Sequence, residues 1–354
     1  MKSAESPVDA RPPSERGNAA PLANARRGSR ASLSGAVLEW FRSGEVLALT
    51  PWTILTILIV LYGSRQAGVY SFNELNIITS ETLTLILIAF GQTLVIVTGG
   101  IDLSIGGILS LVTSLAVLHF GAGGTQMWLV MALLIVGATA AGAINGLLIG
   151  VTRMQPFIVT LATFSIFGGT ALWVLPTTGG AVPTQWVNVG NGAWLGVGAS
   201  VWLLALLAVF WLFFKRTRLW FEIRSIGSSS EAAFLSGVPV VRTIVITYAL
   251  SGLFAALAGL YYITQAVSGS PTVGTDYILT SVIAVVLGGT ALTGGRGGFG
   301  GTIAGAFIPT LIGSVIFIYG IDNHWQSLLE GVLLIFAVLL NVLAAYLVRR
   351  RTAS

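Results

Sequence analysis

The run TLTLILIAFGQTLVIVTGGIDLSIGGILSLVTSLAVLHF, residues 82–120, sets the architecture of this chain. It contains one acidic residue, Asp102, and no lysine or arginine. A helix needs about 20 predominantly apolar residues to cross the hydrocarbon core of a bilayer. The run therefore predicts two membrane-spanning helices, over residues 80–98 and 101–120, with a break at the glycine pair between them.

The composition of the whole chain is that of a membrane protein. Of its 354 residues 55% are apolar and 9% are charged, and the mean hydropathy is +0.88. A soluble domain carries about 25% charged residues, so the burial of a core does not account for so few. With no cysteine and two histidines, the chain lacks thiol chemistry and a histidine-rich metal site. We expect no catalytic residue, no bound cofactor and no metal.

Ten apolar runs of this kind follow one another along the sequence. Each is long enough, or nearly long enough, to cross a membrane as a helix. The predicted fold is therefore an all-α, polytopic membrane protein with about ten transmembrane helices. The predicted spans are residues 45–64, 80–98, 101–120, 127–150, 156–175, 193–214, 242–266, 277–293, 299–320 and 326–347.

The basic residues predict the orientation of these spans. Cytoplasmic loops of membrane proteins carry the excess of lysine and arginine. With the N-terminus inside, 17 of the 18 basic residues fall in inside segments, and Arg65 falls outside. Both termini are therefore predicted to be cytoplasmic. Because the net charge of +5 comes from residues between apolar runs, it does not indicate a nucleic-acid partner.

The N-terminal residues differ in composition from the rest. Residues 1–36 are rich in serine, proline, alanine and arginine and have no sustained apolar run. Such a composition predicts a disordered cytoplasmic tail, and no secretory signal is visible in it. Residues 37–348 are expected to form a single transmembrane domain.

One polar segment interrupts the apolar chain between the sixth and seventh predicted spans. It is SIGSSSEAAFLSGVP, residues 225–239, within the long inside loop 215–241. A serine among residues 228–230 can cap a short helix, and Glu231 suits the positive end of the helix dipole. Gly237 is placed to end that helix. The segment therefore predicts a short amphipathic helix on the cytoplasmic side.

This helix would matter most if the energy for transport came from another protein. A P-loop needs the pattern GxxxxGK[ST], and neither Lys2 nor Lys215 follows a glycine-rich turn. The glycine run 288–301 contains no lysine. ATP-driven transport would therefore need a separate ATPase, and Phe234 and Leu235 could fill a groove on it. The alternative is a helix lying on the lipid surface without a partner.

The break at TGGIDLS, residues 98–104, has two compatible interpretations. Asp102 can cap the next span by accepting a backbone N–H group at its start. An interrupted helix at membrane depth also lines a cavity, because unpaired backbone is tolerated there. The residues predicted for a translocation pathway are Gln92, Gly99, Gly100, Asp102, Ser104 and Asn145.

Small residues recur at every fourth position in several predicted spans. This spacing lets membrane helices approach one another closely, so the favoured interpretation is packing. The sets are Gly142, Gly146 and Gly150; Gly297, Gly301 and Gly305; and the pair Ala255 and Gly259.

The pattern Glu-Ala-Ala-x-x-x-Gly, from Glu231 to Gly237, resembles the coupling-loop signature of permease subunits in bacterial ABC importers. The chain as a whole resembles the sugar branch of these binding-protein-dependent inner-membrane components, of the ribose/xylose/arabinose/galactoside type. The resemblance covers most of 80–345, and the tail 1–36 has no counterpart in it. The matching pieces are GQTLVIVTGGIDLSIGGILSL (91–111), NGLLIGVTRMQPFIVTLAT (145–163), EAAFLSGVPVVRTIVITYALSG (231–252) and AVVLGGTALTGGRGGFGGTIAG (284–305).

The resemblance implies a non-catalytic permease subunit in the bacterial inner (plasma) membrane that translocates a monosaccharide-like solute. It implies a cytoplasmic ATPase that binds ATP and magnesium, an extracytoplasmic sugar-binding protein, and a second permease subunit, commonly identical. By the matched motif, Glu231, Ala232, Ala233 and Gly237 would couple the chain to the ATPase. Phe234 and Leu235 join them as exposed apolar side chains.

Two alternatives stay open at this point. The chain could be an ABC permease for another small solute, such as a nucleoside or an amino acid. It could also be a secondary carrier or facilitator that acts alone, although ion-coupled carriers place more acidic residues at mid-depth. The identity of the sugar, the identity of the second permease and the residues that contact cargo are left open by the sequence.

Overall fold

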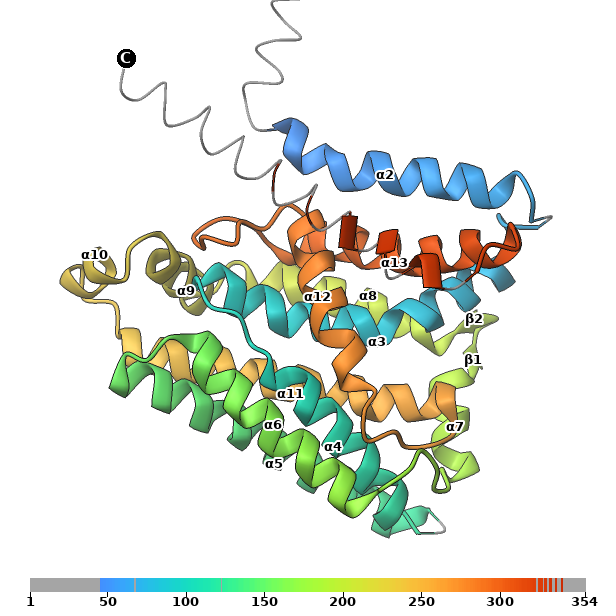
Figure 1. Ribbon diagram of the computed structural model, residues 1–354, viewed down its shortest axis with the longest axis horizontal. Coiled ribbons are helices and arrows are strands. Elements are labelled where there is room, and N and C mark those ends of the chain that lie inside the picture. The colour runs from blue at the N-terminus through green and yellow to red at the C-terminus, as the bar shows by residue number, and fades with distance from the viewer. Residues whose placement is uncertain are drawn as a thin grey trace, which may run out of the picture.

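The computed structural model describes residues 45–66, 68–121, 123–322, 324–326, 328–329, 331–332, 335 and 339. The predicted tail 1–36 and most of the tenth predicted span lie outside these ranges. The described chain is helical apart from one two-stranded hairpin (Figure 1).

Nine predicted spans coincide with helices. Within the described residues, five helices are long and apolar enough to cross a membrane. The number is six if the bent pair α8 (Ala199–Phe214) and α9 (Arg218–Ser228), at 76° to each other, counts as one span. The count of ten spans therefore stays a prediction. The nine helices are α2 (Glu45–Gly63), α3 (Phe72–Val97), α4 (Ser104–His119), α5 (Gly124–Thr152), α6 (Pro156–Val174), α8 (Ala199–Phe214), α11 (Val240–Ala266), α12 (Gly274–Leu287) and α13 (Phe299–Ile318).

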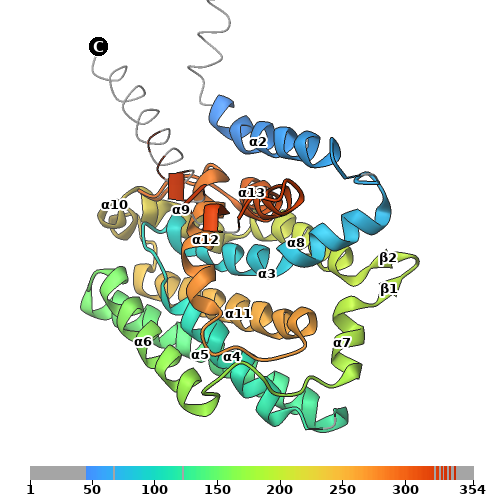
Figure 2. The same cartoon turned by 45° about the vertical axis from the view of Figure 1, so that its right-hand side comes forward.

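Three short helices and two short strands connect the long helices. They are α7 (Thr184–Asn191), α9 (Arg218–Ser228), α10 (Ser230–Leu235), β1 (Ala193–Trp194) and β2 (Val197–Gly198). Both views of the ribbon place α10 at one end of the helix bundle and α7 with the β1–β2 hairpin at the opposite end (Figures 1 and 2).

Helix α3 lies at the centre of the bundle, and α5 and α6 lie at its edge. Burial covers 89% of the most apolar window of α3, against 22% for α5 and 17% for α6. Phe90 of α3 contacts Phe254 of α11 and Phe299 of α13, with ring centroids 4.3 and 4.1 Å away. Because lipid is as apolar as leucine, the exposed faces of α5 and α6 need no protein cover in a membrane.

The close approach of helices at glycine residues confirms that the small-residue spacing serves helix packing. A Cβ atom on Gly142 of α5 would lie 2.1 Å from the carbonyl oxygen of Tyr248 in α11. On Gly305 of α13 it would lie 2.0 Å from the carbonyl oxygen of Ala284 in α12. Real Cβ contacts are longer, so both helix pairs depend on glycine at these positions.

The expected start of the sixth span, at residue 193, is wrong. Residues 193–198 form the β1–β2 hairpin instead, and α8 begins at Ala199. The two residues at its turn, Leu195 and Gly196, both have positive φ (56° and 78°), as tight two-residue hairpins require. The apolar composition of this segment concealed the turn.

The uncharged segment 176–192, between the fifth and sixth predicted spans, contains α7. Its Trp186 Nε1 donates a hydrogen bond to the carbonyl oxygen of Leu260, and its Asn191 Nδ2 donates to that of Thr264. These bonds of 2.9 and 2.8 Å hold α7 against the C-terminal end of α11.

Candidate functional site

The segment predicted as one amphipathic helix is divided between two helices. Residues 225–228 complete α9, and α10 begins at Ser230. Ser229 between them is extended (φ −165°, ψ 111°), and its Oγ accepts a hydrogen bond of 3.2 Å from the Ala232 N–H. A serine therefore caps α10, as predicted. We call α9 and α10 together the α9–α10 arm.

Gly237 ends α10, as the sequence predicts. It has a φ of 82°, a left-handed conformation that costs glycine little. Its N–H donates to the Phe234 carbonyl at 2.9 Å, and the Val238 N–H donates to the Ala233 carbonyl at 3.0 Å. This pair of bonds is the Schellman motif, which satisfies the last carbonyl groups of a helix.

The tip of the α9–α10 arm presents apolar side chains to the outside. Phe234 is 67% exposed and Leu235 is 79% exposed, and Glu231 and Ala232 are exposed beside them. Ala233 is the buried residue of α10. The predicted coupling residues therefore form one exposed tip with a single inward contact.

A buried carboxylate anchors the base of the arm. Glu222 of α9 accepts a hydrogen bond of 2.8 Å from Arg218 Nε on one oxygen. Its other oxygen accepts 2.9 Å from the hydroxyl of Thr243, on α11. This contact joins α9 to α11. Neither Glu222 nor Thr243 was among the residues predicted for the site.

Glycine backbone brings the end of α9 against the end of α3. A Cβ atom on Gly227 would lie 1.8 Å from the carbonyl oxygen of Val97 and 2.5 Å from the nitrogen of Gly295. The Gly295 N–H also donates to the Val97 carbonyl at 2.9 Å. We call Gly227, Val97 and Gly295 the glycine seat. It gives a packing role to the glycine run 288–301.

The predicted break follows α3 directly. Gly99 has a φ of 89°, its N–H donates to the Ile96 carbonyl at 2.9 Å, and the Gly100 N–H donates to the Val95 carbonyl at 3.2 Å. The helix thus ends at the glycine pair, and α4 begins only at Ser104.

Asp102 lies in this break and is 1% exposed. One carboxylate oxygen accepts the Ser104 N–H at 2.9 Å and the Ser104 hydroxyl at 2.5 Å. The other accepts the Ser251 hydroxyl, on α11, at 2.7 Å. Asp102 therefore caps α4, as predicted, and also ties the break to α11.

Asn145 of α5 completes this group. Its Nδ2 donates a hydrogen bond of 2.9 Å to the Ser104 hydroxyl. The structure thus brings together three predicted pathway residues, Asp102, Ser104 and Asn145, with one that the prediction missed, Ser251. We call these four the Asp102 network. A serine in an apolar helix was the only sequence signal for Ser251, and many such serines bond to their own helix.

The other three residues predicted for the pathway, Gln92, Gly99 and Gly100, do not join the Asp102 network. A Cβ atom on Gly100 would lie 2.7 Å from the hydroxyl of Tyr248, and Gly99 is exposed. Among the described residues, Gln92, Tyr248 Oη and Asn145 Oδ1 are buried polar groups with no hydrogen-bond partner. Buried polar groups without a partner are rare in folded proteins.

Comparison with known proteins identifies the relatives of this chain. A protein family described as branched-chain amino acid transport system / permease component matches residues 75–338. The ribose import permease protein RbsC of Escherichia coli K12 is 34% identical over 81% of this chain and 91% of its own length. That of Bacillus subtilis is 35% identical over 84% and 94%.

A relative with another named cargo is similarly close. The autoinducer 2 import system permease protein LsrD of Yersinia enterocolitica is 32% identical over 84% of this chain and 91% of its own length. No solved structure matches the chain.

Proposed function

Because this chain belongs to the permease family described as branched-chain amino acid transport system / permease component, we propose that it is the membrane-spanning subunit of an ABC sugar importer. It carries a monosaccharide-like solute across the bacterial inner membrane and does not itself catalyse a reaction. A separate ATPase binds ATP and magnesium and supplies the energy.

The observation that carries this proposal is the α9–α10 arm. Its tip combines the Glu-Ala-Ala-x-x-x-Gly pattern with two exposed apolar side chains, Phe234 and Leu235. Its base contacts α11 through Glu222 and α3 through the glycine seat. A partner that moves the tip therefore acts on the two most buried of the long helices.

The cargo follows from the relatives and from the charge of the interior. Relatives named for ribose import are 34% and 35% identical to this chain. The Asp102 network offers hydroxyl and amide groups and one carboxylate, which suits an uncharged solute rich in hydroxyl groups. The family description names branched-chain amino acids, so an amino acid is the competing cargo.

The proposed assembly has three kinds of component. Two copies of this chain form the membrane part, an ATPase docks on α10, and an extracytoplasmic binding protein delivers the sugar. The chain has ten spans with both termini in the cytoplasm, and α10 lies on the cytoplasmic side between spans six and seven. Asp102, Ser104 and Asn145, with Gln92, Gly99 and Gly100, lie beside the translocation pathway.

The test is reconstitution of the complete importer in lipid vesicles. We expect uptake of labelled ribose only with ATP, the ATPase and the binding protein together. Glu231→Arg and Gly237→Asp should abolish the stimulation of ATP hydrolysis by the loaded binding protein. Asp276→Arg, an equally exposed charge reversal in the first turn of α12, should leave that stimulation intact.

Two outcomes would overturn the proposal. One is uptake by vesicles that contain this chain alone without ATP, which would make it a facilitator. The other is unchanged stimulation of ATP hydrolysis in both arm variants. Delivery of leucine but not of sugars by the binding protein would replace the cargo and keep the ABC mechanism.

A further inference from the structure

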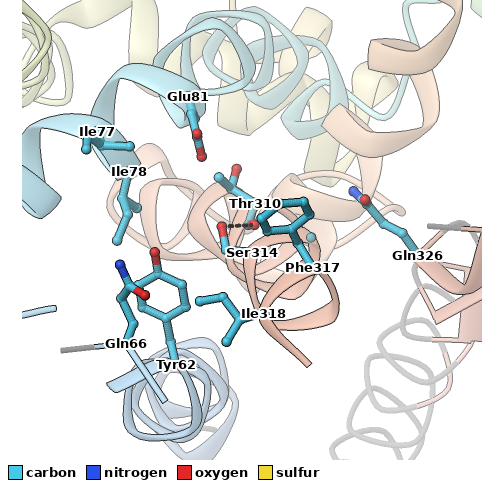
Figure 3. Close-up of a pocket in the computed structure, with 11 residues that line it drawn as sticks. Tyr62, Gln66, Ile77, Ile78, Glu81, Thr310, Ser314, Phe317, Ile318 and Gln326 are labelled. Carbon is cyan, nitrogen blue, oxygen red and sulfur yellow. Dashed lines mark hydrogen bonds between the residues drawn. The ribbon is translucent and has the colours of Figure 1, made fainter. Parts of the chain in front are cut away.

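A cavity of about 510 Å³ lies between the C-terminal end of α2, the first third of α3 and the C-terminal half of α13 (Figure 3). It is separate from both the α9–α10 arm and the Asp102 network. Small-molecule sites have volumes of about 300–1,000 Å³, so this cavity has room for a sugar-sized solute and its water.

Polar side chains from three helices surround the space. Tyr62 comes from the end of α2 and Gln66 from the turn that follows it, Glu81 comes from α3, and Thr310 and Ser314 come from α13. Figure 3 shows the Glu81 carboxylate pointing into the cavity, toward the face of α13 that carries Thr310 and Ser314.

The carboxylate of Glu81 is available as an acceptor. No described residue donates a hydrogen bond to it, and the side chain is exposed to the cavity. The Ser314 hydroxyl donates to the Thr310 carbonyl at 3.1 Å, which leaves its own oxygen free to accept. An ionised carboxylate accepts hydrogen bonds only, so the cavity favours a ligand that donates several.

The other residues that line the cavity favour some of these ligands over others. Ile77, Ile78 and Phe317 provide apolar surface on which the carbon face of a sugar ring can rest. None of the described residues that line the cavity is basic, so the carboxylate of an amino acid would find no cation among them. The wall therefore suits an uncharged polyol better than a zwitterion.

The cavity lies toward the end of the bundle away from the α9–α10 arm, where α2 ends and α3 begins. Figure 1 shows the junction of α2 and α3 at the end opposite α10. In the orientation proposed above, that end faces the extracytoplasmic side, where a binding protein releases its cargo.

We propose that this cavity is an outward-facing binding site for a neutral, polyhydroxylated solute, with Glu81 as its principal hydrogen-bond acceptor. The proposal rests on the proposed function and deepens it, because it assigns the first contacts that cargo makes with the permease.

A single introduced thiol tests the site directly, because the chain contains no cysteine. In the complete importer in right-side-out vesicles, Ser314→Cys should react with a membrane-impermeant maleimide. Saturating ribose should slow this reaction several-fold. Thr275→Cys, exposed in the first turn of α12, should react at the same rate with and without ribose, and Met154→Cys should react only after permeabilisation.

Glu81 is tested by transport kinetics. Loss of one hydrogen bond to a charged acceptor changes affinity about tenfold, so Glu81→Gln should raise the KM for uptake by about that factor. The matched control is Asp276→Asn, a carboxylate outside the cavity, which should leave KM unchanged.

The outcomes separate the two proposals. Absence of protection at Ser314→Cys by ribose and by a panel of other pentoses and hexoses overturns the site. Protection by leucine alone overturns the polyol assignment. If sugars protect this thiol while uptake needs no ATP, the proposed function fails and the site stands.

Discussion

Two buried carboxylates bond to the same helix but are balanced in different ways. Glu222 at the base of the α9–α10 arm accepts the Thr243 hydroxyl, and Asp102 in the break accepts the Ser251 hydroxyl, both from α11. Glu222 also pairs with Arg218, whose side chain is 82% exposed. Among the described residues, the hydrogen-bond partners of Asp102 are hydroxyl and backbone N–H donors.

The difference indicates two separate roles. The charge of Glu222 is balanced by a cation that reaches water, so its bond to α11 can break without leaving a buried charge uncompensated. The charge of Asp102 is balanced by neutral donors and by the N-terminal end of α4, where the helix dipole favours an anion. We interpret the first as an exchangeable contact and the second as a fixed one.

Helix α11 connects the two sites. Thr243 and Ser251 are two helical turns apart on one face, a distance of about 12 Å along the axis. A displacement of the α9–α10 arm must therefore either break the Thr243 bond or shift α11 and, with it, the Asp102 network. The following predictions test this contrast.

The largest expected effect is that of Asp102→Ala. It removes the cap of α4 and leaves the buried Ser251 hydroxyl without an acceptor, so the free energy of unfolding should fall by about 2–4 kcal/mol. Thermal unfolding of the purified protein, followed by tryptophan fluorescence, measures the loss. An unfolding temperature equal to that of the unmodified chain would refute the fixed role of Asp102.

A smaller loss of stability is expected from Glu222→Ala, about 1–2 kcal/mol, because the freed Arg218 side chain turns to water. The same variant should strongly reduce the stimulation of ATP hydrolysis by the loaded binding protein. Glu222→Gln, which keeps an acceptor for Thr243, serves as the control and should retain more of that stimulation. A loss of stability equal to that of Asp102→Ala would contradict the contrast between an exchangeable Glu222 contact and a fixed Asp102 contact.

Removal of each of the two hydroxyl groups on α11 tests the two carboxylate sites separately. Ser251→Ala leaves an oxygen of Asp102 short of a donor and should cost about 1–2 kcal/mol of unfolding free energy. Thr243→Val should cost less than about 1 kcal/mol, because Glu222 keeps Arg218. Chemical denaturation of both variants and of the double variant provides the comparison, and additive losses are expected for sites this far apart. Equal losses in the two single variants would contradict it.

The smallest effect is expected from Arg218→Ala. The pair is an i,i+4 contact with an exposed arginine, and such pairs contribute about 0–1 kcal/mol, less at high salt. Unfolding at low and high salt measures this contribution. A loss above that of Ser251→Ala would show that Arg218, and not α11, holds Glu222 in place.

Much of this arrangement was predictable because it is local. The glycine pair followed by Asp102 and Ser104 predicted a helix end and a cap within seven residues. The caps of α10, Ser229 and Gly237, also follow from neighbouring residues. Each of these caps depends on backbone groups no more than a few positions away in the sequence. Interactions between such close neighbours can be predicted from the residue types alone.

The parts that escaped prediction depend on distant partners. Ser251 meets Asp102 across 149 positions, and nothing in its neighbourhood distinguishes it from a serine bonded to its own helix. Glu222 lies among Arg218 and Arg224, a charge pattern typical of a solvated surface, yet it is buried under α11. Only the packing of the helices makes these two residues important.

The glycine seat has a mechanical consequence for the conformational change of the importer. Side chains absorb small displacements by changing rotamer, but Gly227, Gly295 and the carbonyl of Val97 meet through backbone atoms that have no rotamers. We therefore expect a shift of α9 to displace the end of α3 directly, because no side chain at this contact can take it up. The glycine pair and Asp102 follow that end of α3 in the chain, so the break is the next part of the molecule to feel the displacement.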